Sequence, residues 1–366
     1  MKVGLVAPGA VRSSSSLERR IVTLAGGLAH LGIEVEVVAQ DPALRSMHAS
    51  RHDGVVLVRF PATRHGLGFA TSPPLWEYVR RHVGSWDIFH LHAARGPFGV
   101  AAGAAPSLPL VFTPHACIQR LMRWPHAPAV RAVLDRAARV VALSSAEAEL
   151  IRGLFPHAAH RVEAMPPAVD LMKIRAAAAF DYPGHAVVAS GPLDRHLERA
   201  IAAMAALDEY FGLVILGNGS ATRRLERYAG DLDVRGRVLF AGGAPASVYY
   251  RWLRTARVVV TLADGEPSGS ELVEALAAGA AVVASDINVH REAVGASAVE
   301  ARVRFVEPDC SPLELADAIA DLAAAGAAPG DAPAIPSEVT AAETMVALYQ
   351  SLGAPEPANR LTSRIA

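Results

Sequence analysis

Short apolar runs alternate with amphipathic segments along almost the whole chain. In the first 170 residues, the apolar runs predict buried strands at residues 3–7, 35–39, 55–58, 88–92, 110–113 and 140–143. Between these runs, apolar residues recur at helical spacing and predict helices at residues 17–31, 75–83, 129–138 and 146–154. Gly32 follows the first of these helices, where a left-handed residue often ends the helix.

The alternation pauses at residues 165–170 and 181–184, and then it begins again. Further strands are predicted at residues 186–189, 213–216, 238–240, 258–261, 281–284 and 303–306. Helices are predicted from about residue 194 and at residues 221–229, 246–253, 271–278, 312–322 and 339–352. Strands that alternate with helices form parallel sheets with right-handed crossovers, so we expect an α/β fold with two Rossmann-like, doubly wound domains.

The pauses divide the chain into segments with different expected roles. Residues 1–168 are expected to form the N-terminal domain, residues 169–184 a hinge, and residues 185–336 the C-terminal domain. Residues 337–353 are expected to form a helix that packs back, and residues 354–366 a frayed tail. Ligands of open α/β sheets bind beyond the carboxyl ends of the strands, so a central cleft faced by both domains is the expected site.

Composition and charge narrow the class of protein. The 366 residues are 52% hydrophobic and 19% charged, which fits a globular protein with a large core. No apolar run reaches the length of a membrane span, and Gly4, Pro8 and Gly9 break the N-terminal run. We therefore expect a first strand rather than a signal peptide, and a cytoplasmic protein. The formal charge is +6 over residues 1–170 and −7 over the rest, which suits a phosphate-bearing partner but is too weak to indicate nucleic acid.

Several other chemistries are not favoured. Cys117 and Cys310 provide neither a disulfide framework nor a zinc motif. His90 and His92 share one side of a predicted strand and could bind a metal, but no third ligand is evident, which favours two histidines in a polar cleft. Residues 217–219 lack the third glycine of a dinucleotide fingerprint, and no P-loop motif is present, so we predict neither NAD nor a metal as cofactor.

A basic segment at residues 118–139 leaves three interpretations open. Its only acidic residue is Asp135, and it also contains Trp124. Six of its side chains are arginine or histidine: Arg120, Arg123, His126, Arg131, Arg136 and Arg139. These residues suit an interfacial membrane surface that meets anionic lipid, a solvated helix or an acceptor pocket. Pro125 and Pro128 interrupt any continuous amphipathic helix, which makes weak peripheral contact with the inner membrane face the less favoured interpretation.

The segment at residues 264–279 carries the most chemical information, because it follows a predicted strand and begins a helix. Ser268 and Glu271 have the spacing of a capping box, which predicts that the helix begins at Gly269. The free N–H groups and the positive end of the dipole would then suit a diphosphate, and Gly269 would let a ligand approach the backbone closely.

Two acidic residues accompany this helix start. Glu274 is placed about a turn along the helix, where a carboxylate can accept two hydrogen bonds from vicinal ribose hydroxyls. Glu266 lies on the loop before the helix, beside the expected position of a sugar. An ordinary capped helix with solvated acids fits these residues equally well.

The ordered set of motifs resembles glycosyltransferase family 4, within the glycosyl transferases group 1. Glu266 and Glu274, separated by seven residues, are followed by Ala-Leu-Ala-Ala-Gly and then by Val-Val-Ala-Ser-Asp, as in that family. Other segments agree in the same order along nearly the whole chain: residues 15–19, 24–25, 31–35, 87–92, 113–116, 166–170, 217–219 and 237–242. The resemblance implies a retaining, metal-independent transferase with the GT-B fold, which consists of two Rossmann-like domains facing a central cleft.

The resemblance also implies roles for individual residues. Glu274 is expected to bind the ribose of the donor, Glu266 the hydroxyls of the donor sugar, and His115 to reach that sugar near the reaction centre. Further donor-side positions are Ser268, Gly269, Ser270, Gly191, Arg199, Gly217, Gly219, Phe240 and Gly242, and the first loop contributes Gly9, Ser15 and Ser16. The substrate is a nucleotide sugar, with a UDP-sugar favoured over a GDP-sugar, and no separate cofactor is implied.

The chain departs from the family pattern where the leaving diphosphate is expected. Pro192 and Leu197 occupy the positions of an arginine and a lysine in the family. Arg195 lies in the same loop, and we predict that it supplies the missing cation as a catalytic residue, with Arg199 one turn further along. A serine pair replaces the glycine pair of the first loop, and Ser268 replaces an aromatic residue.

These observations favour a retaining glycosyltransferase that moves a sugar from a nucleoside-diphosphate sugar to an acceptor hydroxyl. A glycoconjugate, a glycolipid or a small natural product would suit as acceptor. Two alternatives stay open: a non-catalytic nucleotide-sugar-binding relative that has lost the arginine and lysine pair, and an epimerase or hydrolase with the same architecture. Pro192 and Leu197 favour the non-catalytic relative, whereas Glu266, Glu274 and His115 favour the enzyme.

Overall fold

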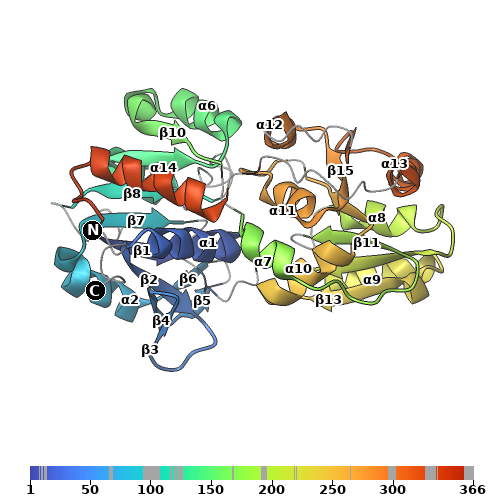
Figure 1. Ribbon diagram of the computed structural model, residues 1–366, viewed down its shortest axis with the longest axis horizontal. Coiled ribbons are helices and arrows are strands. Elements are labelled where there is room, and N and C mark those ends of the chain that lie inside the picture. Colours follow the sequence, from blue (N-terminus) through green and yellow to red (C-terminus); the bar gives the residue numbers. More distant parts are fainter. Residues whose placement is uncertain are drawn as a thin grey trace, which may run out of the picture. The chain divides into compact units, whose positions relative to one another are not determined.

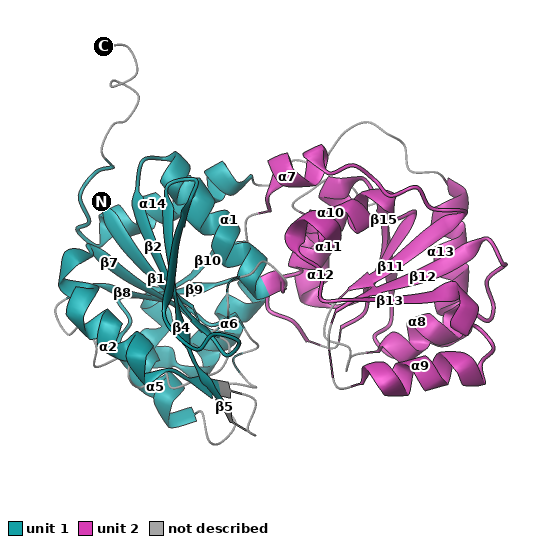
Figure 2. Cartoon of the chain, turned by 90° about the horizontal axis from the view of Figure 1, so that it is seen from below, with its two compact units in different colours: residues 1–11, 17–168, 336–366 teal, residues 12–16, 169–335 magenta. Residues whose placement is uncertain are grey.

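The computed structural model consists of two compact units (Figure 2). Unit 1 comprises Met1–Val11, Leu17–Ala168 and Pro336–Ala366, and unit 2 comprises Arg12–Ser16 and Val169–Ile335. The structure describes residues 1–7, 9, 11, 15–65, 69–93, 108–115, 118, 122, 127–166, 169–190, 196–217, 219, 221–263, 265–295, 302–325, 335 and 337–357.

Unit 1 contains a large sheet that is parallel apart from one edge strand. Among the described residues, its strand order is β10-β9-β8-β7-β1-β2-β4-β3, and β3 runs antiparallel to β4. The strands are β1 (Lys2–Ala7), β2 (Glu34–Asp41), β3 (His48–His52), β4 (Val55–Pro61), β7 (Ile88–His92), β8 (Leu110–Thr113), β9 (Arg139–Ala142) and β10 (Val162–Ala164). A separate antiparallel pair consists of β5 (Thr63–His65) and β6 (Phe69–Thr71).

The helices of unit 1 cover both faces of this sheet (Figure 1). They are α1 (Ser16–His30), α2 (Pro73–His82), α5 (Ala127–Arg136), α6 (Ser145–Leu154) and α14 (Glu338–Ser351), with short 3-10 turns at Val83–Ser85 and Pro156–Arg161. Neighbouring residues of a strand enter opposite cores, as Leu5 and Val6 do in β1. This burial on both faces explains why the strands read as continuous apolar runs.

Helices α1 and α14 pack closely in one of these cores. A Cβ atom on Gly27 of α1 would overlap the carbonyl of Glu338 at the start of α14. Tyr349 and Leu348 of α14 are buried in the same core as Leu28 of α1. The C-terminal helix therefore belongs to unit 1. Gly32 has a φ of +81°, which confirms the left-handed residue predicted after α1.

Unit 2 contains a fully parallel sheet of six strands among its described residues, in the order β13-β12-β11-β14-β15-β16. The strands are β11 (His185–Ser190), β12 (Phe211–Leu216), β13 (Val238–Gly242), β14 (Val258–Thr261), β15 (Ala281–Ser285) and β16 (Val303–Val306). The helices are α7 (Leu171–Ala176), α8 (Leu197–Ala203), α9 (Thr222–Asp231), α10 (Ala246–Thr255), α11 (Ser270–Ala278), α12 (Asn288–Gly295) and α13 (Pro312–Ala325), with a 3-10 turn at Arg235–Arg237.

The strand order reverses once in each unit. In unit 1 the chain moves outward from β1 and then returns to place β7 on the other side of β1. In unit 2 the same reversal places β14 beside β11. Such reversals open a crevice at the carboxyl ends of the strands, where ligands of open α/β folds bind. The carboxyl ends of β7 and β14 therefore lie at these crevices.

The α/β class and the predicted strands are confirmed, with shifts of a few residues at their ends. The antiparallel edge strand β3 was not predicted, because its sequence, His-Ala-Ser-Arg-His, is polar and exposed and its pairing comes from β4. Helix α7 was missed inside the predicted hinge, and α12 was missed between β15 and β16.

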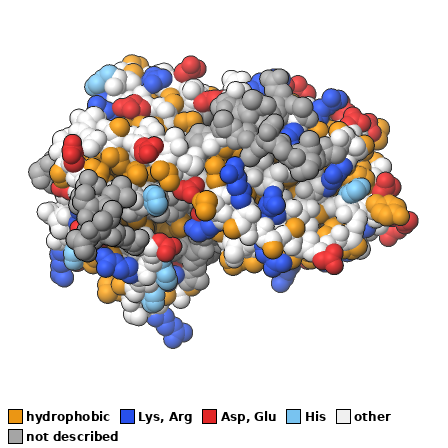
Figure 3. Space-filling view, in the orientation of Figure 1, with side chains coloured by type: hydrophobic (Ala, Val, Ile, Leu, Met, Phe, Trp, Pro, Cys, Tyr) orange, Lys and Arg blue, Asp and Glu red, His pale blue; other side chains and the backbone are white. Residues whose placement is uncertain are grey.

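The basic segment at residues 118–139 is described only in part. Basic and acidic side chains are interspersed on the face drawn in Figure 3. In the described part of residues 118–139, Arg136 donates to the Leu108 carbonyl and Arg139 pairs with Glu163. Arg120, Arg123, Trp124 and His126 lie outside the described residues. None of the described helices is both long and apolar enough to span a bilayer.

Candidate functional site

The start of α11 differs from the predicted capping box. The helix begins at Ser270, and its N-cap residue is Gly269, whose φ of +56° is left-handed and which makes no side-chain capping bond. The carboxylate of Glu271 instead accepts a hydrogen bond from Ser190 Oγ at the end of β11, at 3.2 Å. The capping-box prediction is therefore wrong, because the local Ser-x-x-Glu pattern gives way to a backbone conformation that favours glycine.

Gly269 is also required for packing. A Cβ atom at this position would lie 3.1 Å from Cβ of Ala293 and 3.3 Å from the carbonyl oxygen of Val289, both on α12. The N-terminus of α11 and the helix α12 are thus in direct contact. Ser268 and Ser270 on either side of Gly269 are buried. This part of unit 2 is tightly built, as expected where backbone N–H groups are to meet a ligand.

Glu274 lies on α11 and is 4% exposed. Its Oε2 atom accepts a hydrogen bond from the hydroxyl of Tyr249 on α10, at 3.0 Å. A nearly buried carboxylate needs such donors, since an unsolvated charge without hydrogen bonds is costly. The interpretation of Glu274 as a solvated acid is therefore wrong. The sequence did not single out Tyr249, whose position 25 residues earlier gave no signal.

Glu266 lies on the loop between β14 and α11, and it pairs with a residue that the sequence did not single out. Its Oε1 atom is 2.7 Å from Nε2 of His290 on α12. The other ring nitrogen, Nδ1, is 2.8 Å from the carbonyl oxygen of Ser285 at the end of β15. Burial lowers the pKa of His290, but the hydrogen bond and the charge of Glu266, with smaller effects of Ser285 and Glu271, outweigh it and raise the pKa overall.

The other donor-side positions are spread around unit 2. The N–H of Gly217 donates to the carbonyl of Gly242 at 2.9 Å, which joins the ends of β12 and β13. Phe240 lies on β13 with the guanidinium of Arg235 5.5 Å from its ring centre. Gly219 is an exposed loop residue.

Of the two arginines expected near the leaving diphosphate, Arg199 is among the described residues. Arg199 donates through Nη1 to the carbonyl of Pro308 at 2.5 Å and contacts Nδ1 of His196 at 2.8 Å. Leu197 is buried in a core of unit 2, so this position contributes packing and no charge. Gly191, Pro192 and Arg195 lie outside the described residues.

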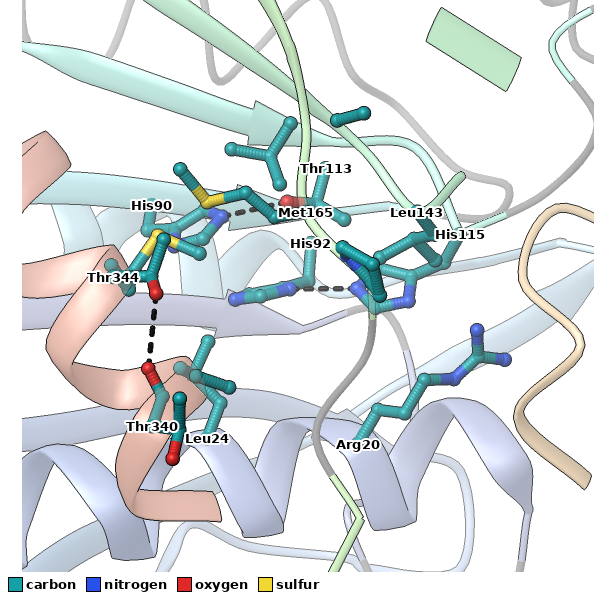
Figure 4. Close-up of a pocket in the computed structure, with 15 residues that line it drawn as sticks. Arg20, Leu24, His90, His92, Thr113, His115, Leu143, Met165, Thr340 and Thr344 are labelled. Atoms are coloured by element: carbon teal, nitrogen blue, oxygen red, sulfur yellow. Dashed lines mark hydrogen bonds between the residues drawn. The ribbon is translucent and has the colours of Figure 1, made fainter. Parts of the chain in front are cut away.

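Unit 1 contains a pocket of about 200 Å³ whose lining is largely apolar (Figure 4). The carboxyl ends of β7, β8, β9 and β10 surround it together with α1 and α14. The lining residues are Arg20, Leu24, His90, His92, Thr113, His115, Val141, Leu143, Ala164, Met165, Pro166, Thr340, Ala341, Thr344 and Met345. Threonine hydroxyls and imidazoles supply most of its polar groups.

Three imidazoles form a row along this pocket (Figure 4). His90 Nδ1 lies 2.7 Å from the hydroxyl of Tyr349, and His90 Nε2 lies 2.9 Å from Oγ1 of Thr113. His92 Nδ1 and His115 Nε2 are 2.7 Å apart and share one hydrogen. Since both nitrogens of His90 are engaged within the protein, this residue offers no nitrogen to a metal here. Among the described residues, no group of three or more histidine, cysteine or acidic side chains is arranged so that it could hold a metal ion.

The environment keeps these imidazoles neutral. Burial lowers the pKa of His92 to about 3. Burial, followed by neighbouring imidazoles and, for His115, Arg20, lowers the pKa of His90 and His115 well below the ordinary value. Neutral imidazole has one donor and one acceptor nitrogen, so the shared hydrogen couples the tautomers of His92 and His115. When His92 Nδ1 donates, its Nε2 is an acceptor and His115 Nδ1 is a donor, and the reverse tautomers exchange these roles.

The outer nitrogens of this pair face the pocket. His92 Nε2 and His115 Nδ1 are both buried, and neither has a hydrogen-bond partner among the residues that the structure describes. His115 also has a φ of +53°, which is unusual for a residue with a side chain and is typical of functional sites. Between them, the two nitrogens offer one donor and one acceptor, which a hydroxyl group or water can satisfy.

The first-loop residues lie near the start of α1. Ser15 is exposed, and Ser16 is the first residue of α1. A Cβ atom on Gly9 would lie 3.2 Å from Oε1 of Glu18, so a side chain there would crowd that carboxylate. Their contact with a diphosphate or an acceptor stays a prediction.

Comparison with known proteins now identifies the fold. Over 97% of this chain and 99% of the other, the structure resembles a sucrose-phosphate synthase from Thermosynechococcus elongatus, with a TM-score of 0.74 and 18% identity. It also resembles Anabaena HepE in complex with UDP and glucose over 96% of this chain and all of the other, with a TM-score of 0.70 and 17% identity. These similarities confirm the expected GT-B fold.

Curated relatives cover most of the chain. A phosphatidyl-myo-inositol mannosyltransferase of Mycolicibacterium smegmatis is 28% identical over 80% of this chain and 78% of its own length. A D-inositol 3-phosphate glycosyltransferase of Xylanimonas cellulosilytica is 27% identical over 75% of this chain and 76% of its own length. The family model of glycosyltransferase family 4 matches residues 17–173, and that of glycosyl transferases group 1 matches residues 183–328. Since these two models match successive parts that together make up most of the chain, the protein is a glycosyltransferase whose N-terminal part matches glycosyltransferase family 4 and whose C-terminal part matches the glycosyl transferases group 1.

Proposed function

We propose that the protein is a retaining glycosyltransferase that moves a sugar from a nucleoside-diphosphate sugar to an acceptor hydroxyl. The observation that carries this proposal is the pair of glutamates that follow β14. Glu274 is buried and receives a hydrogen bond from a neutral phenol, while Glu266 on the preceding loop pairs with a buried imidazole. Two differently supported carboxylates at the reversal of strand order suit recognition of two polyol groups, the ribose and the transferred sugar.

The start of α11 supports a diphosphate between these two groups. A helix N-terminus presents free N–H groups and a positive dipole end, and the left-handed Gly269, packed on α12, fixes where this helix begins. A UDP-sugar is favoured over a GDP-sugar. The HepE structures that resemble this chain contain UDP with glucose or UDP-glucose.

The reaction is proposed to occur by same-face attack on an oxocarbenium-like centre, with stabilisation of the leaving diphosphate as the main catalytic contribution. Leu197 stands where the family has a lysine, and it is a buried core residue without charge. Arg195 is therefore the candidate for the cation that neutralises the leaving diphosphate. His115 acts at the donor sugar, where its neutral imidazole can exchange hydrogen bonds with a hydroxyl. No metal is required in this scheme, since the helix N–H groups and the cation bear the diphosphate charge.

The pocket of unit 1 is the candidate acceptor site. Its lining combines apolar side chains with hydroxyls and neutral imidazoles, which suits an acceptor that presents a hydroxyl on a weakly polar body. Glycolipids, glycoconjugates and small natural products meet this description. The two curated relatives are named for inositol compounds, one of them a phospholipid. A lipid acceptor would bring the enzyme to a membrane surface.

A donor screen tests the proposal. Thermal shift with UDP-sugars and GDP-sugars should reveal stabilisation by one donor, since a ligand that binds the folded state raises the melting temperature. Donor consumption should then increase when a hydroxyl acceptor of the right class is added. Glu274→Gln should lose the stabilisation, whereas Glu209→Gln, which replaces an exposed glutamate of unit 2, should retain it. Absence of a shift with every nucleotide sugar would contradict the proposal.

A further inference from the structure

The ring of His290 faces two groups that can only accept hydrogen bonds. Nδ1 lies 2.8 Å from the backbone carbonyl oxygen of Ser285, and Nε2 lies 2.7 Å from the carboxylate of Glu266. A carbonyl oxygen has no hydrogen to donate, and neither has an ionised carboxylate. With Glu266 ionised, both ring nitrogens carry hydrogen, and the form of histidine that carries both is the imidazolium cation.

The surroundings of His290 stabilise this charge although the ring is fully buried. Its side chain is 0% exposed, and that of Glu266 is 17% exposed. Glu266 faces the ring from the loop after β14, and Glu271 adds negative charge from α11. The neighbouring cation on α12, Arg291, forms an ion pair with Asp286 and is turned to that carboxylate. The raised pKa of His290 agrees with the hydrogen-bond geometry.

The backbone holds the ring in place independently of Glu266. The bond to Ser285 ties the ring to the end of β15. Helix α12, which carries His290, packs on Gly269 through Val289 and Ala293. His290 therefore connects three features of the same region: the end of β15, the start of α11 and the carboxylate of Glu266.

We propose that His290 is the positioning residue for Glu266: as an imidazolium it keeps that carboxylate ionised and turned to the donor sugar. This inference rests on the proposed role of Glu266 in binding that sugar. In this proposal the pair of His290 and Glu266 binds the donor sugar, whereas Glu274 binds the nucleotide. Loss of a proton from His290 at alkaline pH would leave one hydrogen for two acceptors and remove the positive charge beside Glu266, and Glu266 would lose its fixed orientation.

Nuclear magnetic resonance of the full chain, labelled with nitrogen-15 histidine and free of substrate, tests the charge state directly. The two ring nitrogens of His290, assigned by their loss in His290→Gln, should keep imidazolium shifts well above pH about 6.5, where a free histidine is half titrated. Glu266→Gln should lower the pH of that transition, because it removes the negative partner. Shifts of a neutral ring at pH about 6.5 in the wild type would overturn the inference.

Binding and kinetics test the positioning role. His290→Gln keeps a hydrogen-bond donor but removes the positive charge. The variant should therefore bind the nucleotide sugar about 10- to 100-fold more weakly, the range for loss of a charged hydrogen bond. It should leave the affinity for the bare nucleoside diphosphate unchanged and remove the alkaline fall of kcat/KM. His185→Gln, which replaces an exposed histidine of β11, should match the wild type in all three measurements.

The outcomes separate this inference from the proposed function. Equal weakening of bare nucleotide and nucleotide sugar by His290→Gln would indicate a merely structural role and would overturn the inference. A wild-type protein that shows the imidazolium signature but binds no nucleotide sugar would overturn the proposed function and, with it, the role of the pair.

Discussion

Acidification should destabilise unit 1 through the imidazoles of its pocket. The folded protein holds the pKa of His92 at about 3, with burial as the cause, whereas an unfolded chain has a histidine pKa of about 6.5. Between these values the unfolded chain binds more protons than the folded protein, so stability rises with pH. The contribution of His92 is therefore fully present above pH about 6.5 and is lost progressively as the pH falls towards about 3.

The size of the effect follows from the same pKa values. At pH about 5, roughly 1.5 units below the unfolded pKa, His92 remains neutral in the folded protein but is protonated in the unfolded chain. This difference lowers the free energy of unfolding by about 2 kcal/mol relative to pH about 8. His90 and His115 act in the same direction, since burial lowers the pKa of both. Their contributions are not independent, because each proton would repel the next within the row.

Urea unfolding of the full chain, read by pulsed hydrogen exchange at peptides from β7 and β8, isolates the response of unit 1. In the wild type, the free energy of unfolding should fall between pH about 8 and pH about 5; in His92→Gln this fall should be smaller by about 2 kcal/mol. His52→Gln, which replaces an exposed histidine of β3, controls for the substitution itself. The reasoning is refuted if His92→Gln and the wild type lose the same free energy over this interval.

The remaining predictions concern ligand binding and turnover. Glu274→Ala should weaken binding of the bare nucleoside diphosphate by about 1.5–3 kcal/mol for each charged hydrogen bond lost, and unchanged affinity in calorimetry would exclude a ribose contact. His115→Ala should keep that affinity but lower kcat, and a variant that binds less nucleotide at unchanged turnover would contradict its assignment to the sugar. Transfer should continue in EDTA, and a loss that manganese or magnesium restores would show a metal requirement. Arg195→Ala should lower kcat strongly and Arg199→Ala weakly, because Arg199 already donates to the carbonyl of Pro308; wild-type turnover in both variants would reject a role for Arg195.

Much of the fold could be predicted because buried strands leave a direct record in the sequence. Parallel strands covered on both faces are continuous apolar runs, and the runs of unit 1 and unit 2 fall on the observed strands. The edge strand β3 has no such run, since its pairing with β4 and not its own burial makes it a strand. Helix α12 was missed because it is short and buries just a few of its residues, among them Val289 and Val294.

The site was predicted less completely than the fold, because its contacts connect distant parts of the chain. Glu266 and Glu274 could be singled out by their spacing, whereas their partners His290 and Tyr249 belong to other helices. The pair formed by His90 and Tyr349 joins residues 259 positions apart. The sequence indicates a possible metal pair at residues 90 and 92, but it does not indicate that Tyr349 of the C-terminal helix contacts Nδ1 of His90.

The histidines of the two units show how one residue type acquires opposite charge states. In unit 1, His90 and His92 face hydroxyls and another imidazole, which can each donate or accept, so burial prevails and the rings stay neutral. In unit 2, His290 faces a carbonyl and a carboxylate, which can only accept, so the ring takes a second proton despite its burial. The neutral rings lose their stabilising contribution as the pH falls below about 6.5, and the charged ring loses its contribution as the pH rises through its raised pKa. A transferase that uses both sets of histidines is therefore expected to be limited on the acid side by unit 1 and on the alkaline side by unit 2.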